Sequence, residues 1–301
     1  MNRQNTEPEF RCGYIALVGK PNVGKSTLMN HIIGEKISIV TAKPQTTRQQ
    51  IIGIHTSERG QTIYVDTPGI HRSAGKALNR YMNRVARAAL KDIDVVAFLV
   101  EAGRFSPTDE HALNAVLKAG RPSVLVVNKI DLITDKSKLL PFVESITNSY
   151  QFDKVYMVSA LRGNGIATFQ QEMEARLPFS RPWYDADQIT DRSERFLAAE
   201  MIREHLTMRL HQELPYALTV AIDAFEYSPK ITRISATIWV ERDSQKQIVI
   251  GKKGDAIKQV GSGARIAMEE LFEQKIFLKL WVKVSRGWSD DEAALNRFGF
   301  D

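Results

Sequence analysis

The chain has 301 residues, 43% of them hydrophobic and 25% charged, which excludes a largely disordered or fibrous protein and predicts two domains. Lys and Arg outnumber Asp and Glu by 41 to 35, a balance that favours phosphate-bearing partners. The single cysteine, Cys12, excludes a disulfide within the chain, and a cytoplasmic setting is expected. The longest apolar run, 95–100, is far shorter than the roughly 20 residues of a membrane-spanning helix, which leaves only peripheral membrane contact open.

From Tyr14 to about Leu177, short apolar runs alternate with longer segments of helical period. This alternation is typical of parallel strands joined by crossover helices and predicts a doubly wound α/β sheet. Strands are predicted at 14–18, 51–56, 62–65, 95–100, 124–127 and 155–158. Helices are predicted at 25–33, 78–90, 109–118, 136–149 and 166–177.

A proline-containing segment, Pro178 to Tyr184, interrupts the alternation and is interpreted as part of a linker. We therefore expect a first domain at 12–178, a linker at 179–190 and a second domain at 191–301. The second half has a different architecture, with helices expected at 191–211, 255–272 and 289–298 and strands at 217–225, 231–240 and 276–284. The short apolar run 248–250 is compatible with a strand or with a short helix. Ser289 and Glu292 have the form of a capping box that would begin the final helix.

The segment from Gly19 to Ser26 matches the pattern G-x-x-x-x-G-K-[ST] and lies between a predicted strand and a predicted helix. The glycines let backbone N–H groups turn toward a β-phosphate, helped by the positive end of the helix. Lys25 is expected to reach the β- and γ-phosphates, and the Ser26 hydroxyl to bind Mg²⁺. The nucleotide-binding residues predicted from this loop are Gly19, Asn22, Val23, Gly24, Lys25, Ser26 and Thr27.

Asp66-Thr-Pro-Gly69 follows a predicted strand beside the phosphate loop. Asp66 is expected to hold Mg²⁺ through water, and the Gly69 N–H to contact the γ-phosphate. A metal site made of hydroxyl and carboxylate oxygens is therefore predicted next to the phosphates.

Two further motifs predict that the base is guanine. Asn128-Lys129-Ile-Asp131 follows another strand, and the Asp131 carboxylate can accept from the ring N–H and the exocyclic amine of guanine, a pair of donors that adenine lacks. Ser159 and Ala160 follow the last strand, where a backbone N–H can donate to O6 of the base. GTP and GDP are thus the expected ligands.

These motifs resemble the Ras-like P-loop GTPases. The resemblance implies a first switch at 41–48, with Thr47 binding Mg²⁺ in the triphosphate state, and a second switch from Asp66 to about Arg80. Ras-like enzymes carry a glutamine after the Asp-Thr-Pro-Gly motif to orient the attacking water, whereas this chain has Ile70, so slow intrinsic hydrolysis is expected. No catalytic residue is assigned, and the candidates are Asn22, Thr47 and Gly69. In similar GTPases an Asn at the position of Asn22 coordinates K⁺.

In the second half, Gly251-Lys252-Lys253-Gly254 precedes the predicted helix at 255–272. This segment resembles a KH domain, whose Gly-x-x-Gly loop joins two helices and brings backbone close to about four nucleotides of a single strand. The resemblance implies that 248–250 is helical, which gives the α-β-β-α-α-β order of a type II KH domain. A plain structural α+β domain is the alternative. The expected RNA-binding residues are Gly251, Lys252, Lys253, Gly254 and Lys258.

A Ras-like P-loop GTPase domain followed by one C-terminal α+β KH domain of type II resembles the bacterial Era family of GTPases, over nearly the whole chain after about residue 10. The resemblance implies a factor that binds the 3′ end of 16S ribosomal RNA, assists assembly of the 30S subunit and associates peripherally with the inner membrane. We also expect a monomer in which GTP reorients the KH domain through the switches.

Two alternatives remain open at this point. The first is an RNA-binding protein whose nucleotide site is only structural, which Ile70 permits. The second is a membrane-surface signalling GTPase that uses a basic face for anionic lipid.

The distribution of basic residues in the second half predicts where RNA binds, and its tryptophans are considered next. Residues 181–301 hold 18 Lys and Arg against 19 Asp and Glu, but 246–286 hold nine against four, a basic stripe around the Gly-x-x-Gly loop. The four tryptophans are interpreted as packing residues, and only Trp288 is considered for RNA contact.

Overall fold

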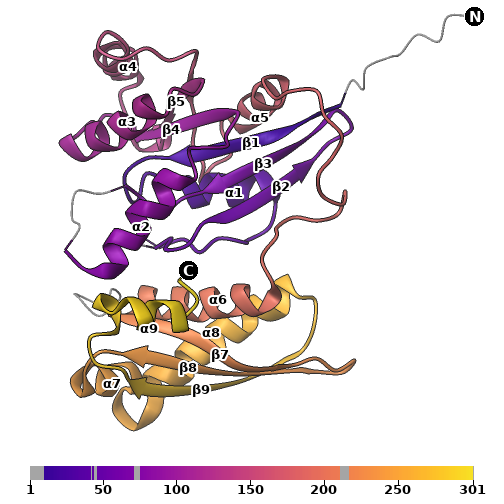
Figure 1. Ribbon diagram of the computed structural model, residues 1–301, viewed down its shortest axis with the longest axis vertical. Helices are drawn as coiled ribbons and strands as arrows, with labels where there is room; N and C mark the ends of the chain where they lie inside the picture. Colours follow the sequence, from indigo (N-terminus) through magenta and orange to yellow (C-terminus); the bar gives the residue numbers. More distant parts are fainter. Residues whose placement is uncertain (1–9, 42, 44–45, 71–74, 211–216, 301) are drawn as a thin grey trace, which may run out of the picture. The chain divides into compact units, whose positions relative to one another are not determined.

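The computed structural model describes residues 10–41, 43, 46–70, 75–210 and 217–300 (Figure 1). The chain divides into two compact units. The N-terminal unit comprises Met1–Ser38, Thr47–Arg72 and Met82–Asp191, and the C-terminal unit comprises Ile39–Thr46, Ser73–Tyr81 and Arg192–Asp301. Two short segments of the first half of the sequence, which include much of both predicted switches, therefore belong to the C-terminal unit.

A six-stranded sheet forms the centre of the N-terminal unit. Its strands are β1 (Arg11–Val18), β2 (Ile51–Thr56), β3 (Gly60–Asp66), β4 (Val95–Glu101), β5 (Ser123–Asn128) and β6 (Val155–Met157), in the order β2-β3-β1-β4-β5-β6. Strands β1 and β3 to β6 are parallel, as predicted, whereas β2 is antiparallel to β3. The prediction of parallel strands is wrong for β2, because three residues separate β2 from β3, and a parallel crossover needs about a dozen.

Helices cover both faces of this sheet. They are α1 (Lys25–Ile33), α2 (Ala77–Ala88), α3 (Pro107–Ala119), α4 (Leu139–Thr147) and α5 (Ile166–Ala175). Side chains of α2, α3 and α4 share one buried core with Ile63 and Val65 of β3. Between these two residues Tyr64 points to the opposite face, as the alternation of a strand requires, and its ring centroid lies 6.5 Å from that of Phe169 in α5.

The C-terminal unit has the expected α-β-β-α-α-β order. Its elements are α6 (Glu194–Arg209), β7 (Leu218–Glu226), β8 (Thr232–Val240), α7 (Asp243–Ile250), α8 (Asp255–Leu271), β9 (Ile276–Val284) and α9 (Glu292–Arg297). The sheet order is β7-β8-β9, with β7 antiparallel and β9 parallel to β8. The run 248–250 is the end of α7, so its strand interpretation is wrong and its helical one is confirmed. The predicted end of the first helix, at 211, lies outside the described residues.

The beginning of the final helix differs from the prediction. Asp291 caps α9, because its Oδ1 accepts hydrogen bonds from the backbone N–H groups of Ala293 at 2.9 Å and Ala294 at 3.3 Å. Ser289, the predicted cap, lies in the short 3₁₀ turn before the helix and donates its hydroxyl to Glu241. An Asp caps as well as a Ser does, and here it stands directly before the first helical turn.

In the part of the chain that the structure describes, no helix combines the length and the hydropathy that crossing a bilayer requires.

Candidate functional site

The phosphate loop connects β1 to α1 through a backbone that only particular residues can adopt. Gly24 caps α1 with a φ of 99°, and a Cβ at this position would lie 2.3 Å from Nδ2 of Asn128. A Cβ on Gly69 would lie 2.6 Å from the backbone nitrogen of Pro21. These two glycines thus keep the loop close to both the Asp66-Thr-Pro-Gly turn and the Asn128 motif, as a site built around a phosphate chain requires.

Lys25 is a buried cation with oxygen partners in the loop itself. Its Nζ donates to the carbonyls of Lys20 at 3.0 Å and Gly19 at 3.3 Å, and the residue is 5% exposed. Burial lowers the pKa of Lys25 to about 8, an effect that the nearby Asp66 carboxylate partly opposes. A buried ammonium at the start of a helix suits the binding of an anionic group such as a phosphate.

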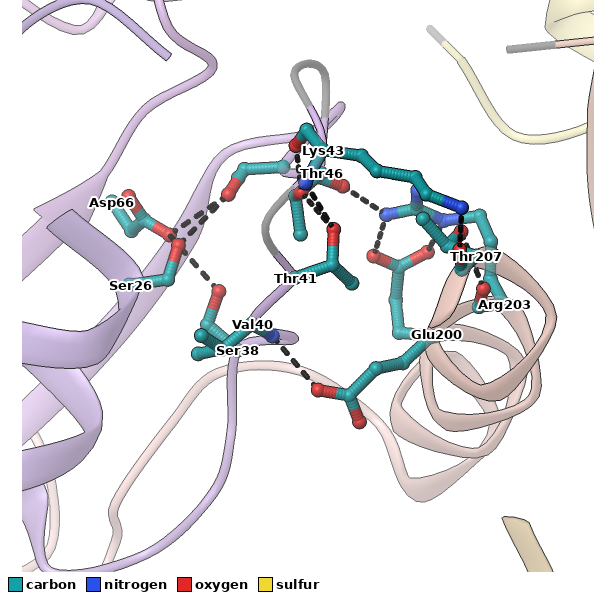
Figure 2. A network of polar contacts seen from close by, with 12 residues as sticks. Ser26, Ser38, Val40, Thr41, Lys43, Thr46, Asp66, Glu200, Arg203 and Thr207 are labelled. Carbon is teal, nitrogen blue, oxygen red and sulfur yellow. Dashed lines mark hydrogen bonds and ion pairs between the residues drawn. The ribbon is translucent and has the colours of Figure 1, made fainter. Parts of the chain in front are cut away.

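The three predicted Mg²⁺ ligands, Ser26, Thr47 and Asp66, lie together. Figure 2 shows Ser26 beside Asp66. Asp66 Oδ2 accepts from the hydroxyls of Ser26 at 2.6 Å and Thr47 at 3.2 Å, and the two hydroxyl oxygens are 2.9 Å apart. Ser38, which no sequence pattern marks, donates to the same carboxylate oxygen at 2.9 Å. The sequence therefore predicted three members of this cluster and missed the fourth.

The cluster fits a small divalent cation. Burial raises the pKa of Asp66, whereas the charge of Lys25 and the three hydroxyl donors lower it. Its Oδ1 is buried and has no hydrogen-bond partner among the described residues. A carboxylate and hydroxyls are hard oxygen ligands of the kind that Mg²⁺ prefers, and Ser26, Thr47 and Asp66 are the residues that would hold it.

The predicted base-binding motifs are also brought together. The Oδ1 of Asn128 accepts from the backbone N–H of Ala160 at 2.9 Å, which joins the two base-binding motifs, and its Nδ2 donates to the carbonyl of Val23 in the phosphate loop at 2.8 Å. Asp131 is exposed and accepts from the hydroxyl of Ser159 at 2.5 Å. Lys129 has a φ of 63° and pairs with Glu101 at 2.8 Å.

Three other predicted residues lie in the phosphate loop or in the helix that follows it, whereas Ile70 lies in the core. Asn22 has a φ of 65° at the turn of the loop, and Val23 is fully buried. Thr27 is partly buried in the first turn of α1. Ile70 is fully buried in the core that α2, α3 and α4 share with the sheet, so its side chain does not face a phosphate site.

Three contacts hold residues in and just before the predicted first switch at 41–48 to α6 within the C-terminal unit (Figure 2). The Val40 N–H donates to Glu204 Oε1 at 2.8 Å, and Lys43 Nζ donates to the Thr207 carbonyl at 2.6 Å. Arg203, which also pairs with Glu200, donates to the carbonyl of Thr46. Residues 42, 44 and 45 of this predicted switch lie outside the described residues.

The described end of the second-switch segment makes similar contacts within the same unit. The Ala77 N–H donates to Asp290 Oδ1 at 2.8 Å, and Lys76 lies 3.2 Å from the Ser289 hydroxyl. Residues 71–74 of this predicted switch are outside the described part. No motif signals these partners, because each pair is 213 positions apart in the sequence.

The Gly-x-x-Gly loop joins α7 to α8 and has an unusual backbone. Gly251, Lys253 and Gly254 have φ values of 74°, 53° and 81°. The side chains of Lys252, Lys253 and Lys258 are exposed. Beside the loop lies an open cavity of about 290 Å³, lined by Ile257, Lys258, Gly261, Ser262, Arg265, Leu278 and Leu280. This lining combines apolar side chains with the cations of Lys258 and Arg265, which suits a nucleic-acid strand.

Trp288 is a packing residue, so the packing interpretation is confirmed for it and the RNA contact considered for it is wrong. Trp288 is fully buried, and its Nε1 donates to the carbonyl of Ala217 at 3.3 Å. By contrast, Trp281, which was interpreted as a packing residue, is 50% exposed. Trp288 lies in the short 3₁₀ turn after β9, whereas Trp281 lies on β9 itself, and composition does not reveal this difference.

Comparisons with known proteins agree with both units. A family model described as "50S ribosome-binding GTPase" matches residues 14–129, and a KH domain model matches residues 213–289. GTPase Era of Stenotrophomonas maltophilia is 49% identical over 290 residues, which cover 96% of this chain and 97% of that protein. GTPase Era of Ectopseudomonas mendocina is 50% identical over 293 residues, with coverages of 97% and 98%.

Solved structures give the same result. A crystal structure of Era in complex with MgGDPNP and nucleotides 1506–1542 of 16S ribosomal RNA matches with a TM-score of 0.94 at 34% identity, covering 97% of this chain and 99% of that one. A crystal structure of a single-residue variant of Aquifex aeolicus Era bound to GDP·AlF₄⁻ matches with a TM-score of 0.93, also at 34% identity, with coverages of 96% and 99%.

Proposed function

Because this chain belongs to the Era family of GTPases, we propose that it couples GTP binding and hydrolysis to binding of the 3′ end of 16S ribosomal RNA. By this coupling it assists assembly of the 30S subunit. The GTPase and KH domains themselves follow from the family.

The observation that carries the coupling is the way residues 38–47, which overlap the first switch, are divided. At the two ends of this range, Ser38 and Thr47 donate to Asp66 in the nucleotide site. Between them, Val40 and Lys43 donate to α6, in the unit that also carries the Gly-x-x-Gly loop. A rearrangement of Thr47 that depends on the γ-phosphate is therefore transmitted through a few residues to α6.

RNA binding is assigned to the Gly251–Gly254 loop and the adjoining cavity. The exposed Lys252, Lys253 and Lys258 contact phosphates, and the two glycines allow backbone to approach the strand. The Era structure that contains nucleotides 1506–1542 of 16S ribosomal RNA supports this RNA as the partner.

Within the nucleotide site, we assign the triphosphate to Gly19, Lys25 and Gly69, and the guanine base to Asp131. Hydrolysis is slow without a partner, because Ile70 stands where Ras-like enzymes place a glutamine and its side chain lies in the core. Asn22, in the turn of the loop, coordinates K⁺.

The remaining assignments concern the surroundings of the protein. The domains at 12–178 and 191–301, joined by 179–190, work as a monomer in the cytoplasm. The nine cations of 246–286 support an additional peripheral contact with anionic lipid of the inner membrane. Pelleting of the chain with anionic vesicles at one salt concentration tests that contact.

The main proposal is tested by the affinity of the full chain for an RNA of 16S nucleotides 1506–1542, measured with a non-hydrolysable GTP analogue and with GDP. We expect tighter binding in the GTP-analogue state. The variant Lys252→Glu/Lys253→Glu should reduce the affinity at least tenfold. Lys136→Glu/Lys138→Glu, an exposed pair in the N-terminal unit that changes the net charge equally, should change it less than threefold.

Two outcomes would contradict the proposal separately. Equal affinity in both nucleotide states rejects the coupling but leaves RNA binding intact. Equal effects of the two lysine pairs reject the Gly-x-x-Gly loop as the RNA contact. Single-turnover GTP hydrolysis then separates an enzyme from an RNA-binding protein with a structural nucleotide.

A further inference from the structure

The sheet of the C-terminal unit has a second face, opposite to the face packed by α6, α7 and α8. Along β9, Ile276 and Val282 point into the helix-covered core, whereas Phe277 and Trp281 point away from it. These two rings are 49% and 50% exposed. Aromatic rings left half exposed on a regular strand are accessible to a ligand that can stack on them.

Cations lie beside the rings of this face. The Arg233 guanidinium carbon is 5.6 Å from the centroid of Phe277, its neighbour across β8 and β9. Lys279 Nζ is 4.8 Å from the centroid of Trp281. Lys283 Nζ is 5.6 Å from the ring of Trp239. We call the set of these side chains the outer face: Arg233, Trp239, Phe277, Lys279, Trp281 and Lys283.

The three cations of the outer face are available to an anionic ligand. Arg233, Lys279 and Lys283 are all exposed. Within the described ranges of the chain, none of them lies within 4.0 Å of a carboxylate oxygen. Their interactions with the rings are cation–π contacts, which leave the N–H donors free to reach a phosphate.

We propose that the outer face is a second RNA-binding surface, on which unpaired bases stack on Phe277 and Trp281 while Arg233, Lys279 and Lys283 bind the phosphates. The two rings are four positions apart along the strand, a distance of about 13 Å, so each holds a different base. Exposed aromatic rings next to cations are the combination with which proteins bind single strands with little sequence preference. This inference rests on the proposed RNA-binding function.

The position of β9 explains why RNA is the ligand. β9 is an edge strand of the sheet. On its inner face, Leu278 and Leu280 line the cavity beside α8. On its outer face are Phe277 and Trp281. An RNA strand that leaves the cavity therefore needs to cross only this edge to reach the second surface, and one RNA can occupy both.

The test uses the full chain and an RNA of 16S nucleotides 1506–1542. We expect Phe277→Ala/Trp281→Ala to weaken RNA binding at least tenfold, since each stacked base contributes about 5- to 150-fold. Trp281→Phe, which keeps a ring, should retain most of the affinity. The control is Phe179→Ala, because Phe179 is 53% exposed and has Arg11 4.0 Å from its centroid, but lies in the N-terminal unit.

Direct contact is measured by ultraviolet crosslinking of the same RNA to the wild-type chain. Crosslinked nucleotides should be found on the peptide that contains residues 277–281. Lys279→Gln/Lys283→Gln, which leaves the rings in place, should weaken binding about threefold to tenfold and flatten its dependence on salt. This variant keeps the proposal testable if the double alanine variant fails to fold.

Three results would overturn the inference. Wild-type affinity of the folded Phe277→Ala/Trp281→Ala variant, while Lys252→Glu/Lys253→Glu abolishes binding, rejects the outer face and leaves the proposed function intact. If the Phe277→Ala/Trp281→Ala variant loses binding to anionic vesicles but keeps its affinity for RNA, the outer face binds a membrane and not RNA. If the wild-type chain fails to bind the RNA at all, the proposed function fails together with the inference.

Discussion

The backbone N–H of Val40 donates a hydrogen bond to Oε1 of Glu204 at 2.8 Å. Two residues before Val40, the hydroxyl of Ser38 donates to Asp66 in the predicted metal site. The segment 38–40 thus contacts, at one end, the carboxylate that would hold Mg²⁺ and, at the other end, helix α6. Glu204 is fully buried, which makes its position sensitive to any movement of that segment.

Replacing the Glu204 carboxylate tests this connection. We expect Glu204→Ala to leave GDP affinity within about threefold of the wild type while reducing the difference in RNA affinity between the two nucleotide states. Removing a buried acceptor costs about 1–3 kcal/mol of stability, because the Val40 N–H loses its partner. Glu204→Gln keeps an acceptor oxygen and is the matched control. An unchanged nucleotide dependence in a folded Glu204→Ala variant would show that this contact transmits nothing.

Ile70 offers a test of why intrinsic hydrolysis is slow. If its side chain lies in the core, Ile70→Gln should not accelerate single-turnover hydrolysis, although it supplies the residue that Ras-like enzymes use. It should instead lower the free energy of unfolding by about 1–3 kcal/mol, because a buried amide lacks partners there. Ile70→Val, with an expected loss of about 1 kcal/mol, is the control for packing. A faster, equally stable Ile70→Gln enzyme would contradict the buried position.

The pKa of Lys25, lowered to about 8 by burial, predicts proton uptake on nucleotide binding. Above pH 8 the nucleotide-free chain has a largely neutral Lys25, and the phosphates raise its pKa again, so binding takes up a proton and the affinity for GDP falls as the pH rises. Calorimetry at pH 8.5 in buffers of different ionisation enthalpy measures this uptake, with pH 7 as the reference. Lys25→Arg, which stays charged, should show none, and uptake that is equal at both pH values would disprove the lowered pKa.

The lowered pKa of Lys25 also affects the folding stability of the nucleotide-free chain. This stability changes with pH in the opposite direction to the affinity for GDP. Between about pH 8 and the unfolded value near 10.5, the unfolded state binds more protons at Lys25 than the folded state does. The contribution of Lys25 to stability therefore rises with pH in this window. Below pH 8 the buried lysine is charged and lowers the stability of the nucleotide-free protein. A bound phosphate offsets this cost because it pairs with the ammonium group.

The proposed K⁺ coordination by Asn22 predicts that the rate of GTP hydrolysis depends on which monovalent cation is present. Hydrolysis by the wild-type chain should be several-fold faster in KCl than in NaCl at equal ionic strength, and Asn22→Ala should lose the difference while still binding GDP. The φ of 65° at Asn22 is accessible to Asn but costs an alanine about 1 kcal/mol, so Asn22→Gly is a useful second variant. Equal wild-type rates in the two salts would exclude the K⁺ role.

Local patterns predicted the parts of the site that follow directly from chain neighbours. The phosphate loop, Asp66 and the Asn128 motif each follow a strand of a parallel sheet, whose carboxyl ends meet at one edge, so their convergence could be expected. Ser38 and Glu204 could not be expected, because Glu204 meets its partner across 164 positions and neither residue belongs to a motif.

The errors have equally physical origins. Apolar alternation does not reveal strand direction, so it predicts a parallel β2, although the three-residue connection from β2 to β3 permits only a hairpin. Side-chain type alone does not tell whether an indole is buried. It therefore allows an RNA contact for Trp288, which is buried in the turn after β9, and predicts packing for Trp281, which is half exposed.

The separation of 164 positions between Val40 and Glu204 also affects the order in which the two residues become available during synthesis of the chain. At about 5–20 residues per second, the ribosome completes α6 roughly 10–30 s after it has made residues 39–46. During that interval the nascent chain carries its phosphate loop while the partners of this segment do not yet exist. A newly made molecule therefore passes through a stage in which residues 39–46 lack the restraint that α6 later imposes.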